Sequence, residues 1–117
     1  MSTAGETGLL GENLAAAYLE RRGMRLTARN YRCRLGEIDL VAWDGETLCF
    51  VEVKARTNWE MGLPREYVTA KKREKLRAAA ALYLSEQGLE CPARFDVAEV
   101  YLKAGRRARI DYIKNAF

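Results

Sequence analysis

The stretch Asp39-Leu-Val-Ala-Trp-Asp-Gly-Glu-Thr-Leu-Cys-Phe-Val-Glu-Val-Lys54 decides how this chain folds. Two runs rich in apolar residues, at 36–43 and 48–55, flank the dipeptide Asp44-Gly45, which is a strong signal for a hairpin turn. We therefore predict two antiparallel strands joined at this turn. An acid opens the stretch and Glu-x-Lys closes it, at positions where a half-buried sheet normally carries apolar or neutral side chains.

The length of the hairpin loop decides whether the acids meet. Side chains alternate along a strand, so Phe50, Glu52 and Lys54 share one face of the sheet. Two loop residues would pair Asp39 with Phe50, and four would place Asp39 directly opposite Glu52. Three loop residues would put the two acids on opposite faces and exclude a shared site.

Two neighbouring carboxylates would need a cation. At about 4 Å they repel by roughly 4 kcal/mol at an effective dielectric constant of about 20, so one would take up a proton. A site with few protein oxygen ligands suits Mg²⁺ or Mn²⁺. We predict Asp39 and Glu52 as metal ligands and the Val53 carbonyl as a further ligand. Lys54 either orients the attacking water or stabilises negative charge on the phosphate. The alternative is an ordinary sheet face with a Lys–Glu salt bridge.

Further acids and bases surround this stretch. Glu12 lies in an apolar arc of the first predicted helix, where it either interacts with the helix N-terminus or supports the metal. Glu37 precedes Asp39 by two residues and shares its face. Lys72 belongs to a basic run that opens the second predicted helix, on the stripe that faces the sheet, and we expect it to reach inward.

Several basic residues flank the proposed site in sequence and are candidate phosphate contacts. Each has the alternative role of an ordinary solvated charge. The predicted nucleic-acid-binding residues are Arg29, Arg32, Arg34, Arg56 and Lys72, with Arg65 in a long loop over 56–68. The same loop carries Trp59 and Tyr67, which either stack on bases or pack over the core.

The remaining pattern predicts one α/β domain over residues 1–117. A broad apolar helical arc that includes Leu9 and Leu10 ends at Gly23, and Thr69 is a suitable N-cap for the second helix. The predicted order is α-β-β-β-α-β-β. Its ranges are helix 9–22, strands 24–31, 36–43 and 48–55, helix 69–87, and strands 94–102 and 109–114.

Composition excludes several classes of function. The 117 residues include no histidine, which excludes Ser-His-Asp and Cys-His catalysis and histidine-ligated zinc. Three widely spaced cysteines indicate free thiols in a reducing cytoplasm, and no apolar run is long enough to span a membrane. The net charge of +4 suits a polyanionic partner.

With these residues assembled, the chain resembles the YraN family of small bacterial proteins. The resemblance covers nearly the whole chain. Its motifs are Gly11-Glu12 with Ala15 to Leu19, Arg29-Asn30-Tyr31-Arg32, Gly36-Glu37-Ile38-Asp39-Leu40, Phe50-Val51-Glu52-Val53-Lys54 with Arg56, Val68-Thr69 with Lys72, Arg94-Phe95-Asp96-Val97 and Asn115-Ala116-Phe117.

That family is similar to the PD-(D/E)xK nucleases of the Holliday-junction resolvase type. The resemblance implies a restriction-endonuclease-like α-β-β-β-α-β core with a mixed central sheet flanked by helices. It matches Glu12 to the helix glutamate, Asp39 to the motif aspartate, Glu52 to the second acid and Lys54 to the catalytic lysine. Ile38 stands where the superfamily motif has its proline. Similarity to the resolvases implies a homodimer that acts on branched DNA.

Two hypotheses follow from these observations. The first is a Mg²⁺- or Mn²⁺-dependent endonuclease that hydrolyses phosphodiester bonds in DNA, with branched or structured DNA of repair and recombination as the implied substrate. The second is a non-catalytic nucleic-acid-binding or adaptor domain on the same fold. The four candidate catalytic residues are all intact, which favours the enzyme. At this stage DNA or RNA, branched or linear substrate, and activity alone or only with a partner all remain open.

Overall fold

The computed structural model describes residues 4–57, 69–103 and 105–117. The order of elements is the predicted α-β-β-β-α-β-β, with the first helix beginning five residues before its predicted start. The elements are α1 (Ala4–Arg21), β1 (Arg25–Cys33), β2 (Gly36–Asp44), β3 (Thr47–Arg56), α2 (Ala70–Glu86), β4 (Ala93–Tyr101) and β5 (Arg109–Ile113). The predicted roles of Trp59, Arg65 and Tyr67 fall outside the described residues.

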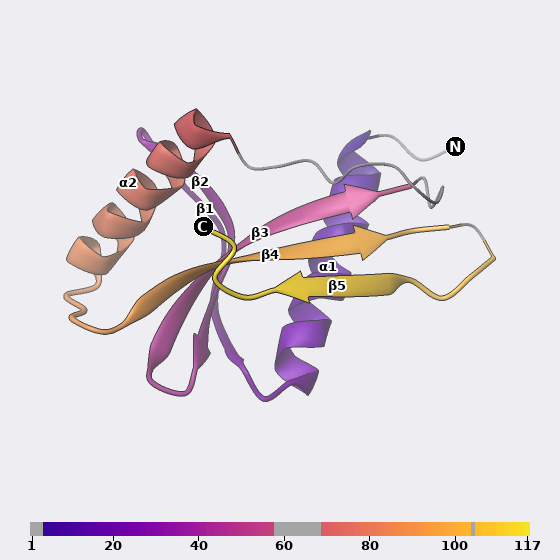
Figure 1. The fold of residues 1–117 in the computed structure, drawn as a ribbon, viewed down its shortest axis with the longest axis horizontal. Helices are drawn as coiled ribbons and strands as arrows, with labels where there is room; N and C mark the ends of the chain where they lie inside the picture. The colour runs from indigo at the N-terminus through magenta and orange to yellow at the C-terminus, as the bar shows by residue number, and fades with distance from the viewer. Residues whose placement is uncertain (1–3, 58–68, 104) are drawn as a thin grey trace.

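The five strands form one mixed sheet in the order β1-β2-β3-β4-β5. The chain leaves β3 through α2 and returns as β4, parallel to β3, while the other neighbouring strands are antiparallel. In Figure 1, α1 runs behind the sheet and α2 lies at the other end of the molecule. Each helix packs on its own apolar cluster, so the two helices cover opposite faces. This arrangement is the predicted restriction-endonuclease-like α/β core.

The predicted end of α1 at Gly23 and the predicted N-cap of α2 at Thr69 are confirmed, but the predicted apolar arc of α1 is only partly buried. Gly23 adopts a positive φ of 82° just after α1, and the Thr69 side chain accepts a hydrogen bond from the backbone N–H of Lys72 at 3.2 Å. Leu9 and Leu10 are 56% and 49% exposed, whereas Ala15, Ala16 and Leu19 further along the helix are buried. Neither helix of the described part is long and apolar enough to cross a membrane.

The β2–β3 hairpin adopts the register that brings the acids together. Trp43 pairs with Leu48 and Leu40 pairs with Val51, which is the register predicted for a loop of four residues, 44–47. Within that loop, Asp44 and Thr47 form one further pair. Asp39 immediately precedes Leu40, and Glu52 immediately follows Val51, so Asp39 is level with Glu52. The faces of β3 are also as predicted, because Phe50 packs in the α2-side cluster and Val51 in the α1-side cluster.

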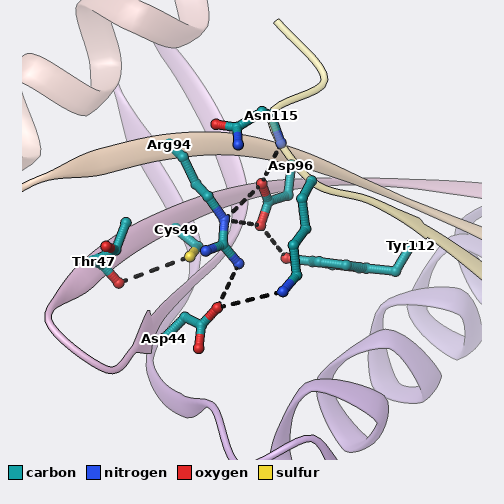
Figure 2. Close-up of polar contacts among 8 residues, drawn as sticks. Asp44, Thr47, Cys49, Arg94, Asp96, Tyr112 and Asn115 are labelled. Carbon is teal, nitrogen blue, oxygen red and sulfur yellow. Dashed lines mark hydrogen bonds and ion pairs between the residues drawn. The ribbon is translucent and has the colours of Figure 1, made fainter.

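A buried polar network ties this hairpin to the C-terminal part of the chain (Figure 2). Asp96 is fully buried on β4 and accepts hydrogen bonds from Arg94 Nε at 3.0 Å, from the Tyr112 hydroxyl and from the backbone N–H of Asn115 at 3.0 Å. Arg94 also lies 2.8 Å from Asp44 at the hairpin turn. A buried carboxylate is costly unless it is paired and hydrogen-bonded, so these donors fix β4, β5 and the turn relative to one another.

The thiol of Cys49 lies next to this network and is unreactive. Burial, with a further contribution from the Asp96 carboxylate, raises the pKa of Cys49 to about 12. The thiolate is the reactive form of cysteine, so Cys49 is protonated at neutral pH and serves as a small core residue.

Two glycines of α1 give a matched test of helix–sheet packing. A Cβ added at Gly11 would lie 2.9 Å from the Ala55 Cβ of β3, whereas a Cβ at Gly8 would meet nothing within 4 Å. We expect Gly8→Ala to raise the free energy of unfolding by up to about 1 kcal/mol through helix propensity. We expect Gly11→Ala to lower it by about 1–2 kcal/mol, because overpacking costs about 1–3 kcal/mol. Urea unfolding measures both, and equal stabilisation would contradict close packing at Gly11.

Candidate functional site

Asp39 and Glu52 lie side by side where β2 and β3 separate. The backbone pairing of these strands ends at Leu40–Val51, and beyond it the Asp39 carboxylate accepts a hydrogen bond from the backbone N–H of Val53 at 2.8 Å. Both acids line a hollow of about 220 Å³ between the sheet and α2. The other lining residues are Gly36, Glu37, Lys72, Lys75 and Leu76. The hairpin therefore presents two carboxylates to one solvent-accessible hollow.

The surroundings of the Asp39 carboxyl group disfavour its ionised form. The pKa of Asp39 is raised to about 6, mainly by burial and next by the neighbouring charge of Glu52, and the Val53 hydrogen bond opposes both effects. Smaller contributions come from Glu37 and Glu12. A carboxylate in this state gains free energy from a bound proton or from a bound cation.

Two lysines compensate the charge of Glu52. Lys72 of α2 reaches inward as predicted and places Nζ 2.8 Å from Glu52 Oε1, while Lys54 Nζ lies 3.9 Å from the same oxygen. Burial alone would lower the pKa of Lys72, but the hydrogen bond and the charge of Glu52 raise it above its ordinary value. Lys72 is therefore cationic at neutral pH, and both lysines lie where a negatively charged ligand would meet them.

Glu12 approaches Asp39 from the opposite face of the sheet. It is a buried residue of α1 that accepts hydrogen bonds from Arg29 Nη2 at 2.8 Å and from Asn30 Nδ2 at 3.0 Å. A second hollow of about 220 Å³ lies on this side and shares Asp39 with the first. Its lining residues are Gly8, Glu12, Asn30, Glu37, Asp39, Val53 and Ala55. Asp39 thus stands between a hollow on the α1 side and a hollow on the α2 side.

The four predicted metal ligands are close in space but do not surround one point. Among the residues that the structure describes, no three acidic, cysteine or histidine side chains are gathered as a metal site. Glu12 is engaged by Arg29 and Asn30, whereas Glu52 faces α2. The pair of Asp39 and Glu52 fits a hard divalent cation, because such ions take oxygen ligands and complete their shell with water or phosphate. The Val53 carbonyl and Glu12 stay predictions as ligands.

The predicted phosphate-binding arginines occupy different settings. Arg29 is bound to Glu12, and Arg56 lies 3.7 Å from the buried Glu99 of β4. Arg32 is exposed and pairs with Glu37 at 3.2 Å, and Arg34 is exposed at the β1–β2 turn. The side chain of Arg32 is 75% exposed, against 37% for Arg29 and 21% for Arg56. Nucleic-acid contact stays a prediction for all four arginines.

One site residue did not enter the predicted list. Asn30 lines the α1-side hollow with a positive φ of 51° and donates to Glu12. Asparagine is among the residues that tolerate this backbone conformation, and its place inside a predicted strand, where asparagine is depleted, is the signal that could have identified it.

The fold and this acidic hairpin define a class of small α/β proteins with a two-carboxylate, two-lysine site. A family model described as "Uncharacterised protein family UPF0102" matches residues 11–100. The chain belongs to the UPF0102 family, which confirms the YraN family prediction.

Curated relatives match over nearly their whole length. A UPF0102 protein of Chlorobium chlorochromatii is 52% identical over 118 residues, which cover 96% of this chain and 91% of the relative. One from Pelotomaculum thermopropionicum is 48% identical over 112 residues, with coverage of 94% and 93%. One from Nocardia farcinica is 48% identical over 111 residues, with coverage of 94% and 87%.

The raised pKa of Asp39 has a measurable consequence for stability. The folded pKa of about 6 lies above the ordinary value of 3.8, so the contribution of protonated Asp39 to stability is complete below about pH 4 and is lost as pH rises through about 6. We therefore expect Asp39→Asn, without divalent cations, to raise the free energy of unfolding by about 1–3 kcal/mol near pH 8. The gain should shrink to nearly nothing near pH 4.

Urea unfolding across this pH range, with a chelator present, measures the effect. Glu46→Gln is the matched control, because Glu46 is exposed at the hairpin turn and its change should not depend on pH. A stability difference for Asp39→Asn that does not vary between about pH 4 and pH 8 would show that the surroundings of Asp39 do not disfavour its ionised form.

Proposed function

We propose that this protein is a metal-dependent endonuclease that hydrolyses phosphodiester bonds in DNA. The observation that supports it most is the placement of Asp39 level with Glu52, in one hollow with Lys72 and beside Lys54. Two carboxylates and two ammonium groups at one opening give oxygen ligands for a cation and positive charge for a phosphate.

Each side chain has a role in this proposal. Asp39 and Glu52 would hold Mg²⁺ or Mn²⁺, which when bound supplies charge neutralisation at the phosphate and acidifies water. Lys54 orients the attacking water or stabilises the negative charge that develops on the phosphate. Lys72 lies 2.8 Å from Glu52 and places a second cation at the same opening. Glu12, held by Arg29, adds negative charge near Asp39 from the α1 side.

The nature of the substrate rests on charge and on resemblance. The net charge of +4 and the exposed Arg32 and Arg34 suit a nucleic-acid backbone. The resemblance to Holliday-junction resolvases favours branched DNA and a homodimer, and both are part of this proposal. The edge strand β1 carries these two arginines beside its turn, which would place DNA along that side of the sheet.

A second candidate function is a non-catalytic nucleic-acid-binding or adaptor domain. The observation that favours it is the ion pairing within the site, since Glu12 is bound by Arg29 and Glu52 by Lys72. Such pairs satisfy the buried carboxylates without a metal. In this case the basic residues alone would bind nucleic acid, and cleavage would be absent.

Cleavage of a labelled four-way DNA junction and a matched linear duplex, with Mg²⁺ or Mn²⁺, tests the proposal. We expect wild-type cleavage that requires the metal, and a loss of about 10²-fold or more in kcat for Lys54→Ala, because a group that stabilises transition-state charge is removed. Lys103→Ala removes the same charge at an exposed position after β4 and should keep wild-type activity.

Lys72→Ala and Lys71→Ala form a second matched pair on α2. Lys71 is exposed, whereas Lys72 reaches Glu52, so only Lys72→Ala should reduce cleavage strongly. Salt-sensitive binding of both DNAs by wild type without cleavage under any of these conditions would favour the adaptor. Cleavage that survives Lys54→Ala unchanged would contradict the proposed site.

A further inference from the structure

Asn30 interrupts the β1–β2 ladder at the level of Asp39. The pairs Arg29–Leu40 and Tyr31–Ile38 keep one register on either side, yet the pair that would join Asn30 to Asp39 is absent from the ladder. Asn30 adopts a φ of 51°, and among the described residues Asn115 is the only other non-glycine residue with a positive φ. The left-handed conformation costs most residues about 1–2 kcal/mol, which asparagine partly avoids by local hydrogen bonding.

Both strands reverse their faces at this point. Val41 and Ile38 are three residues apart on β2, yet both pack in the α2-side cluster. Ala28 and Tyr31 are three apart on β1 and pack against the same cluster. In a regular strand, residues three apart point to opposite faces. Asn30 and Asp39 are therefore the two residues at which the alternation breaks, one on each strand.

The break decides where the Asp39 carboxylate lies. Leu40, the next residue, is fully buried in the α1-side cluster, and Ile38, the previous one, is buried in the α2-side cluster. Asp39 lies between them and lines both hollows. Its Oδ2 atom accepts the Val53 N–H, so the side chain continues the contact between β2 and β3 after their backbone ladder has ended.

The side chain of Asn30 extends the same arrangement to α1. Its Nδ2 donates to Glu12 Oε1 at 3.0 Å, the oxygen that also accepts from Arg29. Asn30 thus contacts Glu12 through its side chain and faces Asp39 through its backbone position. Two of the proposed site acids therefore lie next to this one residue.

We infer that Asn30 is a positioning residue of the site, whose left-handed backbone holds the β1–β2 ladder open so that Asp39 reaches Val53 and both hollows. The inference gives Asn30 a role in the proposed nuclease and in that respect rests on the proposed function. Its structural part concerns only the Asp39–Val53 contact and can be measured without any activity.

Three substitutions distinguish the contribution of the Asn30 backbone conformation from that of its side chain. Asn30→Gly keeps the positive φ and loses the amide, and Asn30→Asp keeps tolerance of that φ but replaces the donor with a carboxylate beside Glu12. Asn30→Val is β-branched and disfavours the positive φ. The first readout is hydrogen exchange of the Val53 amide, compared with the Val51 amide, which lies in the regular part of the ladder opposite Leu40.

We expect Asn30→Gly and Asn30→Asp to keep the protection of Val53 within about threefold of wild type. Asn30→Val should lower it by about tenfold or more while Val51 keeps its protection. Unchanged protection of Val53 in Asn30→Val would overturn the inference. An equal loss at Val51 and Val53 would also overturn it, because the effect would then be global. A loss in Asn30→Gly as large as in Asn30→Val would overturn the backbone role.

Cleavage kinetics of the same variants supply the second readout. Where wild type cleaves DNA, Asn30→Val should lower kcat by about tenfold or more and leave KM within about threefold, because misplaced catalytic groups affect the reaction more than binding. Asn30→Gly should retain most of kcat, and a kcat as low as that of Asn30→Val would overturn the catalytic part. Absence of wild-type cleavage would count against the proposed nuclease, and Val53 exchange would still decide the role of Asn30.

Discussion

The hydrogen bond from the Val53 N–H to the Asp39 carboxylate is the contact on which the site depends. It joins β2 to β3 where their backbone ladder has ended, and it holds a half-buried carboxylate next to Glu52. Burial and the charge of Glu52 work against ionisation of Asp39, and raise its pKa to about 6. The fold thus holds a carboxylate whose ionised form a bound cation would stabilise. A carboxyl group with such a raised pKa is more typical of functional sites than of surface sheets.

The surrounding charges are arranged in opposite pairs across the sheet. Glu12 is bound by Arg29 on the α1 side, and Glu52 is bound by Lys72 on the α2 side, which leaves Asp39 between the two pairs. The Arg94–Asp96 network at the hairpin turn contributes at a distance, because it ties Asp44 to β4 and so supports the register that aligns Asp39 with Glu52. Helix, sheet and turn each supply part of one polar centre.

The fold and the acidic pair could be predicted because strand alternation and turn residues fix them locally. The Asp44-Gly45 turn and the alternation on β3 limited the register to a few alternatives, and the observed register is one of them. The contacts between distant segments could not be read in the same way. Asn30 breaks a pattern that appears regular in sequence, and the fully buried Asp96 owes its satisfaction to Tyr112 and Asn115 from the end of the chain.

The central claim is that Asp39 and Glu52 bind a divalent cation, and titration with Mn²⁺ followed by NMR tests it most directly. A paramagnetic ion broadens the amide signals that lie close to it. We expect the signals of Asp39, Glu52 and Val53 to broaden first, with the effect abolished in Asp39→Asn and reversed by excess Mg²⁺. Broadening that begins instead at Asp44 or Asp111, or that persists unchanged in Asp39→Asn, would contradict the claim.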